Sequence, residues 1–102
     1  MLLIAGFVRF DPSQRDATVS AILEIVRETR KEPGCLRYVV AEDVEHPDTL
    51  RVFEAWASWE SLEAHFITPH MNRFRSRVGG LGVREFTLQK YQIDPGAPTG
   101  LA

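Results

Sequence analysis

The stretch that decides the fold is CLRYVVAEDVEHPDTLRVFEAWA, residues 35–57. Cys35–Glu42 and Thr49–Ala57 both alternate side chains in the way that a β-strand requires. The loop between them, Val44–Asp48, contains a proline and acidic residues, which are typical of turns. Two strands joined by so short a loop predict an antiparallel hairpin.

The alternation also predicts which side chains share a face. In the first strand of the hairpin, one face is expected to carry Leu36, Tyr38 and Val40, and the other Cys35, Arg37, Val39 and Ala41. In the second strand, one face is expected to carry Val52, Glu54 and Trp56, and the other Arg51, Phe53, Ala55 and Ala57.

A helix is predicted before the hairpin, over Asp16–Glu32. Its apolar stripe has the spacing of one helix face, with Val19, Ile22, Leu23 and Val26, and is widened by Ala21 and Ile25. Pro33-Gly34 ends this helix just before the first strand of the hairpin.

A second helical region follows the hairpin, and it is predicted to be broken in two. Ser58 is a suitable N-cap for the first segment, whose apolar stripe is Trp59, Leu62 and Phe66. Thr68 caps the second segment, in which Pro69 takes the favoured first helical position. Gly79-Gly80 ends it.

Strands at the two ends complete the pattern. Leu2–Phe10 is apolar on both faces, which indicates a central strand, and Val83–Ile93 is the last strand. The order β-α-β-β-α-β predicts an α+β, ferredoxin-like fold with a four-stranded antiparallel sheet. Residues 1–93 form the expected domain, and residues 94–102, rich in proline and glycine, the expected flexible tail.

The predicted helices cover one face of the sheet, so the apolar residues on the other face need a partner. The first strand is apolar on both sides, and the third presents Phe53, Ala55 and Ala57 away from Trp56. A sheet with an apolar open face usually packs on another copy of itself, so we expect a homodimer.

Composition limits the functions that fit. The 102 residues allow one domain, so a nucleotide-binding domain with a separate substrate domain is excluded. Twelve basic and fourteen acidic residues give a net charge of −2, which argues against nucleic acid as a partner. No apolar run approaches a membrane span, so no membrane partner is expected.

The single cysteine, Cys35, excludes an internal disulfide framework. A reducing, cytoplasmic setting is therefore the default expectation. The first ten residues lack a basic region and a cleavage site, so we interpret them as a strand and not as a signal peptide.

Sequence motifs for common cofactors are missing. The chain contains no GxGxxG, no phosphate loop and no GxSxG. His65 and His70 are clustered, but a spacing of five residues does not place both on one helix face, and Pro69 lies between them. We therefore expect no metal site.

The stretch after the third strand resembles a known family. Glu54-x-Trp56 is followed by Ala64-His65 and by Thr68-Pro69-His70, and Glu32-Pro33-Gly34 precedes the hairpin. Together with Cys35-Leu36-x-Tyr38 and Phe74, these residues resemble the antibiotic biosynthesis monooxygenase (ABM) domain family, of the quinol monooxygenase type.

The resemblance covers roughly residues 2–93 and implies a dimeric α/β barrel with a pocket between sheet and helices in each protomer. Members include cofactor-independent oxygenases of quinols and phenols, haem-degrading enzymes and an isomerase. Haem-degrading relatives use an Asn on the first strand and a late helical His, and this chain has neither. The resemblance therefore implies no cofactor, with a small aromatic substrate and dioxygen as partners.

In a cofactor-free oxygenase, a base removes a phenolic proton and the substrate supplies the electrons. His65 has the pKa range for this base, and Glu54 either orients a histidine or is itself the base. The aromatic residues Trp56, Tyr38 and Phe66 are expected to bind substrate, together with His70.

Purely structural roles are open for most of these residues: a hydrogen bond to a nearby carbonyl or to Glu54 for His65, a salt bridge for Glu54, core packing for Trp56 and Tyr38, and a surface or capping role for His70. The leading prediction is a monooxygenase of a small quinol-type substrate. The alternatives are a non-oxidative isomerase or cyclase on the same fold, with His65 as its base, and a binding module without turnover.

Overall fold

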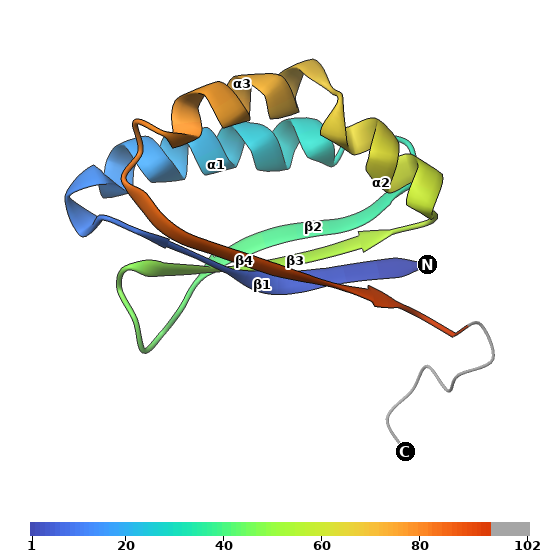
Figure 1. Cartoon of the computed structure of the whole chain (residues 1–102), viewed down its shortest axis with the longest axis horizontal. Helices are drawn as coiled ribbons and strands as arrows, with labels where there is room; N and C mark the ends of the chain where they lie inside the picture. The colour runs from blue at the N-terminus through green and yellow to red at the C-terminus, as the bar shows by residue number, and fades with distance from the viewer. Residues whose placement is uncertain (95–102) are drawn as a thin grey trace.

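Helices lie on one face of a single sheet in the computed structural model, which describes residues 1–94 (Figure 1). The expected tail therefore lies outside the described residues, apart from Asp94. The elements in chain order are β1 (Leu2–Phe10), the 3-10 turn η1 (Pro12–Gln14), α1 (Arg15–Thr29), β2 (Cys35–Glu42), β3 (Thr49–Trp56), α2 (Trp59–Phe66), α3 (Pro69–Val78) and β4 (Val83–Gln92).

The sheet is antiparallel throughout, with the strand order β2-β3-β1-β4. The ferredoxin-like fold and the hairpin are thus confirmed, and β1 is a central strand, as its apolar residues predict. Leu2, Ile4, Val8 and Phe10 of β1 are buried beneath the helices. Close pairing of β1 with β4 requires Gly6, because a Cβ there would lie 1.9 Å from the carbonyl oxygen of Thr87.

A bulge near the start of β2 overturns the predicted alternation there. Cys35 is opposite Trp56 and Tyr38 is opposite Glu54, whereas the register shifts between Cys35 and Arg37. Cys35 therefore shares the helix-covered face with Tyr38, and Leu36 is 54% exposed. One extra residue in a bulge moves the neighbouring side chain to the other face, which strict alternation cannot anticipate.

The helix α1 ends at Thr29, three residues earlier than predicted. The buried part of the predicted stripe is Ala21, Ile25 and Val26, whereas Leu23 at its other edge is 44% exposed. After Thr29 the chain turns, and the amide of Glu32 donates to the carbonyl oxygen of Thr29 at 3.0 Å. Glu32 thus lies in a turn instead of a helix.

Gly34 completes this turn in a conformation that favours glycine, with φ of +83°. A Cβ at this position would lie 2.4 Å from Cβ of Ser61 in α2. The turn therefore packs closely on α2, and it brings Glu32 next to the end of that helix.

The predicted break between α2 and α3 is confirmed. The Ser58 hydroxyl accepts from the Ser61 amide at 3.2 Å and caps α2. In return, the Ser61 hydroxyl accepts from the Ser58 amide. The Thr68 hydroxyl accepts from the Met71 amide at 3.3 Å and caps α3, with Pro69 as its first residue.

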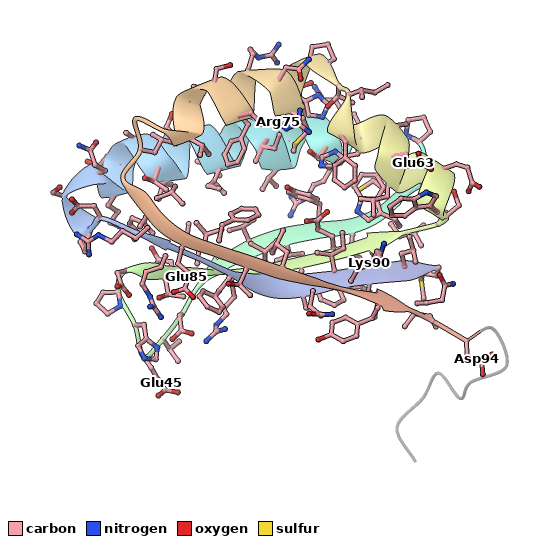
Figure 2. All side chains as sticks on the ribbon, in the orientation of Figure 1. Glu45, Glu63, Arg75, Glu85, Lys90 and Asp94 are labelled. Carbon is pink, nitrogen blue, oxygen red and sulfur yellow. The ribbon has the colours of Figure 1, made fainter. Side chains whose placement is uncertain are left out.

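On the opposite face of the sheet, residues 1–94 place no helix (Figure 2). Its side chains include the apolar Phe53, Val39 and Tyr91, which are 39%, 41% and 50% exposed. No helix in the described part of the chain is both long and apolar enough to cross a membrane.

Candidate active site

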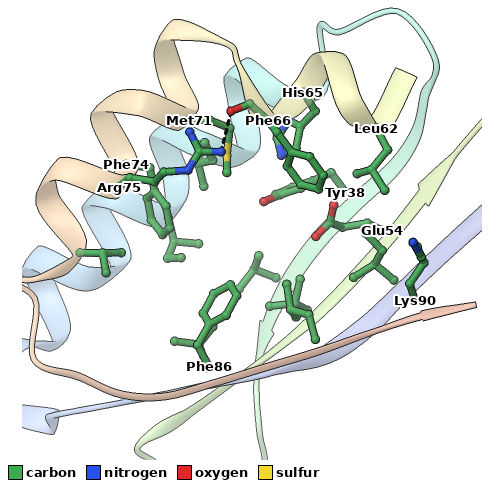
Figure 3. Close-up of a pocket in the computed structure, with 18 of the residues that line it drawn as sticks. Tyr38, Glu54, Leu62, His65, Phe66, Met71, Phe74, Arg75, Phe86 and Lys90 are labelled. Atoms are coloured by element: carbon green, nitrogen blue, oxygen red, sulfur yellow. Dashed lines mark hydrogen bonds between the residues drawn. The ribbon is translucent and has the colours of Figure 1, made fainter. Parts of the chain in front are cut away.

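A cavity of about 570 Å³ lies between the helices and the covered face of the sheet (Figure 3). Its walls are mainly aliphatic and aromatic, and its volume is typical of a small-molecule site. Phe66 and Phe86 line it and are 40% and 55% exposed, so the cavity opens between α2 and the edge strand β4. The polar residues that line it are Tyr38, Glu54, His65, Arg75, Gln89 and Lys90.

His65, at the last turn of α2, is the buried histidine of the cavity wall. Its Nδ1 lies 2.6 Å from Oε2 of Glu32. Because a carboxylate only accepts hydrogen bonds, Nδ1 donates and Nε2 carries the free lone pair of the neutral ring. Within residues 1–94 no hydrogen bond is made by Nε2, which leaves that atom for a substrate.

Burial lowers the pKa of His65, because desolvation disfavours the charged ring more than the Glu32 carboxylate favours it. The ring is therefore neutral at neutral pH. A neutral imidazole oriented by a carboxylate, with its free nitrogen toward an apolar cavity, is the arrangement of a general base.

Glu32 has a second histidine partner. Nε2 of His70, at the start of α3, lies 2.7 Å from the same Oε2 atom that contacts His65. The side chains of Glu32, His65 and His70 are 10%, 3% and 11% exposed. The break at Thr68-Pro69 turns the chain so that two histidines five residues apart approach one point, which corrects the expectation that their spacing separates them.

Glu54 extends into the cavity from β3 (Figure 3). Its Oε1 accepts a hydrogen bond from Nε1 of Trp56 at 3.0 Å, so it does not form the salt bridge that was one alternative. Burial raises the pKa of Glu54, since desolvation outweighs the Trp56 hydrogen bond, and the charge of Glu32 adds to the increase. Glu54 is therefore a carboxyl group that holds its proton more readily than an exposed one.

Trp56 and His70 are not part of the cavity wall formed by the described residues, although both were predicted to bind substrate. Trp56 is fully buried, and its ring centroid lies 4.8 Å from that of His65. It contacts both Glu54 and His65.

Tyr38 and Phe66 do line the cavity, as predicted. The Tyr38 ring centroid lies 5.8 Å from that of His65. Burial raises the pKa of Tyr38, with the charges of Glu54 and Glu32 adding to it, so the phenol keeps its proton. Its hydroxyl group therefore retains a hydrogen that it can donate.

Three residues at or next to the cavity were not among the predicted site residues. Glu32 was quoted only as part of a motif, and its contact with His65 joins positions 33 residues apart. Lys90 of β4 lies over the Trp59 ring, with Nζ 4.1 Å from the centroid. Arg75 of α3 donates to the Phe66 carbonyl oxygen at 2.5 Å. These contacts depend on the packing of α2 and α3 over the sheet, which no local pattern shows.

Fold and cavity together define a class of small α+β proteins, in which a mainly apolar cavity lies between a four-stranded sheet and its helices. The chain belongs to the antibiotic biosynthesis monooxygenase (ABM) family, whose sequence profile matches residues 1–77. The resemblance stated from the motifs is thereby confirmed.

One curated relative and two solved structures are similar to this chain. The "Probable quinol monooxygenase YgiN" of Escherichia coli (strain K12) is 33% identical over an alignment of 90 residues. The match covers 78% of this chain and 86% of that protein. The structure of Rv0793 from Mycobacterium tuberculosis is 27% identical, with a TM-score of 0.80 over 94% of this chain and 97% of that one. A structure from Deinococcus radiodurans is 21% identical and shows the same fold, with a TM-score of 0.88 over 98% and 99% of the two chains.

Proposed function

We propose that this protein is a monooxygenase that oxidises a small phenol or quinol with dioxygen and needs no cofactor. One observation carries the proposal: His65 is held by Glu32 with its free nitrogen available to an apolar cavity of about 570 Å³. The 33% identity to a protein named a probable quinol monooxygenase supports the substrate class.

The reaction balances without an external reductant. A phenol with a hydrogen at the para carbon and one dioxygen give a para-quinone and one water. Nε2 of His65 takes the phenolic proton, and the phenolate then passes an electron to dioxygen. The two radicals join at the para carbon as a peroxide, the O–O bond breaks as the carbon loses its hydrogen, and one oxygen leaves as water.

The remaining cavity residues serve this sequence. Phe66 and the aliphatic walls enclose a planar ring and exclude water, which favours electron transfer from the phenolate. Tyr38 donates to a substrate oxygen, and Glu54 supplies a proton to the leaving oxygen. Trp56 and His70 hold Glu54 and Glu32 in place.

Oxygen uptake with a panel of naphthols and quinols tests the proposal. We expect wild type to exceed autoxidation, and His65→Gln to lose about 10²–10⁴-fold in rate, the usual contribution of a general base. His46→Gln is the matched control, because His46 is exposed and pairs with Asp43. With labelled dioxygen, the quinone formed from a naphthol with a free para position should gain one labelled oxygen. Wild-type uptake equal to autoxidation across the panel would refute the proposal.

A proton-transfer reaction without oxygen is the second candidate. Arg75 and Lys90 line the cavity, and two cations suit a substrate with an anionic group, as an isomerase or cyclase of a phosphorylated compound would need. His65 would then move a carbon-bound proton. Exchange of substrate hydrogen with deuterated water, in the absence of oxygen uptake, would favour this candidate.

We also propose that the protein works as a homodimer in the cytoplasm. The uncovered sheet face carries Phe53, Val39 and Tyr91 at 39–50% exposure, a surface that a second copy would bury. The free cysteine fits a reducing compartment. Light scattering should give twice the 11.6 kDa of one chain, and Phe53→Glu should give one chain. A monomeric wild type at micromolar concentration contradicts the dimer.

A further inference from the structure

Three metal-ligand side chains from three segments converge beside the cavity. They are Glu32 of the turn after α1, His65 at the end of α2 and His70 at the start of α3, and their ligand atoms lie within 4.8 Å of one another. We propose that Glu32, His65 and His70 form a binding site for one divalent transition-metal ion, Zn²⁺ or Cu²⁺, that controls the proposed base.

The donor set fits such an ion. Two imidazoles and one carboxylate are common ligands of Zn²⁺ in open sites, where water takes the fourth position. Imidazole nitrogen also suits Cu²⁺ and Ni²⁺, whereas Mg²⁺ and Ca²⁺ prefer oxygen ligands alone. The carboxylate brings one negative charge, which offsets part of the charge of the ion.

The geometry is close to that of a bound state. Oε2 of Glu32 now lies 2.6 Å from Nδ1 of His65 and 2.7 Å from Nε2 of His70, so the three atoms already meet at one place. Ligands at zinc distances in a tetrahedral site are about 3.3 Å apart. Each histidine nitrogen must therefore move less than about 1 Å away from Oε2. The two nitrogens, which lie within 4.8 Å of each other, must approach by up to about 1.5 Å, which is the scale of small side-chain rotations.

The proposed site is largely enclosed by the protein. The three side chains are 3–11% exposed, and His70 and Glu32 form its outer edge. An ion placed there would be shielded from bulk water on the side of His65 and Trp56. His46, which pairs with Asp43, is 56% exposed, and this pair has no third ligand among the described residues.

His65 cannot bind the ion and act as a base at the same time. This part of the inference rests on the proposed function. An ion on Nδ1 removes the hydrogen bond to Glu32 and occupies the nitrogen that now carries the hydrogen. The hydrogen of the neutral ring must then lie on Nε2, which loses its free lone pair. The ion would therefore inhibit the oxidation.

Quenching of tryptophan emission by Cu²⁺ measures binding without any substrate. Trp56 lies 4.8 Å from His65, close enough for contact quenching by an ion on that ring. We expect saturable quenching with one ion per chain, weakened about tenfold or more in Glu32→Gln and in His70→Ala. Trp56→Phe should lose most of the quenching. Circular dichroism shows whether each variant is folded.

The control and the contrary outcomes are distinct. His46→Ala should bind Cu²⁺ as wild type does, because His46 lies on the loop between β2 and β3. Equal affinity in wild type and His70→Ala, loss of binding in His46→Ala, or no saturation below millimolar Cu²⁺ would each overturn the proposal. Zn²⁺ should compete with Cu²⁺ for the site.

The two proposals fail separately. Zn²⁺ should inhibit oxygen uptake in wild type and in His46→Ala over the concentration range in which it displaces Cu²⁺. Oxidation without saturable ion binding would refute the metal site alone. Specific ion binding without oxidation of any substrate would refute the proposed function and leave the site standing.

Discussion

Replacing Glu32 with alanine tests the link between the turn and the two histidines. The change removes the acceptor of His65 Nδ1 and His70 Nε2. A buried donor without an acceptor costs about 1–3 kcal/mol. The His65 side chain is 3% exposed and bears the full cost, whereas water reaches His70 and offsets part of its loss. We expect a decrease of about 2–4 kcal/mol in the free energy of unfolding.

Glu32→Gln separates the acceptor from its charge. The amide oxygen still accepts hydrogen bonds, but a neutral bond is weaker than a charge-assisted one by about 1 kcal/mol. Two bonds are affected, so we expect a loss of about 1–2 kcal/mol, smaller than that of the alanine variant.

Urea unfolding at pH 8, followed by circular dichroism, measures both losses. Glu28→Ala is the matched control, because Glu28 is an exposed residue of α1 paired with Lys31 at 3.2 Å. Such a surface pair contributes about 0–1 kcal/mol. A loss below about 1 kcal/mol for Glu32→Ala, or equal losses for alanine and glutamine, would refute the shared hydrogen-bond acceptor.

Three further predictions concern single residues. Gly34→Ala should lower the free energy of unfolding by about 1–2 kcal/mol or more, because φ is +83° and a Cβ would contact Ser61. Gly79→Ala is the control in the same urea titration and should be neutral, because a Cβ there meets no atom within 4 Å. Because the pKa of Glu54 is raised in the folded state, the free energy of unfolding should fall as pH rises from 4.5 through the raised value. Glu54→Gln should flatten this decline in urea midpoints measured across that range. An equal decline in wild type and variant would contradict the raised pKa. Ser58→Ala should cost about 1 kcal/mol by loss of the α2 cap, and thermal unfolding that is unchanged would show the cap to be unimportant.

Local chemistry explains why most of the fold follows from the sequence. The caps at Ser58 and Thr68, the proline at the first position of α3 and the apolar β1 act within a few residues of themselves. Their effects are therefore visible as short patterns. The bulge in β2 is different, because it depends on pairing with β3 and leaves the alternation of Cys35–Glu42 unchanged in the sequence.

Four of the six residues predicted for the site line one cavity, namely His65, Glu54, Tyr38 and Phe66. Trp56 was expected at the cavity because it shares a strand face with Glu54, but that face continues beneath α2, where Trp56 is fully buried. Which part of a strand face is covered depends on where the helix lies over it.

The sequence by itself determined the element order, the break between α2 and α3, and the family. Only the tertiary structure decided that Glu32 meets His65 and His70, since α1 ends at Thr29 and the close turn at Gly34 packs on α2. Residues 33 and 38 positions apart thereby share one carboxylate oxygen. The physical reason is that spacing along a chain specifies neighbours within one element, whereas contacts between elements depend on where each one ends and how the helices pack on the sheet.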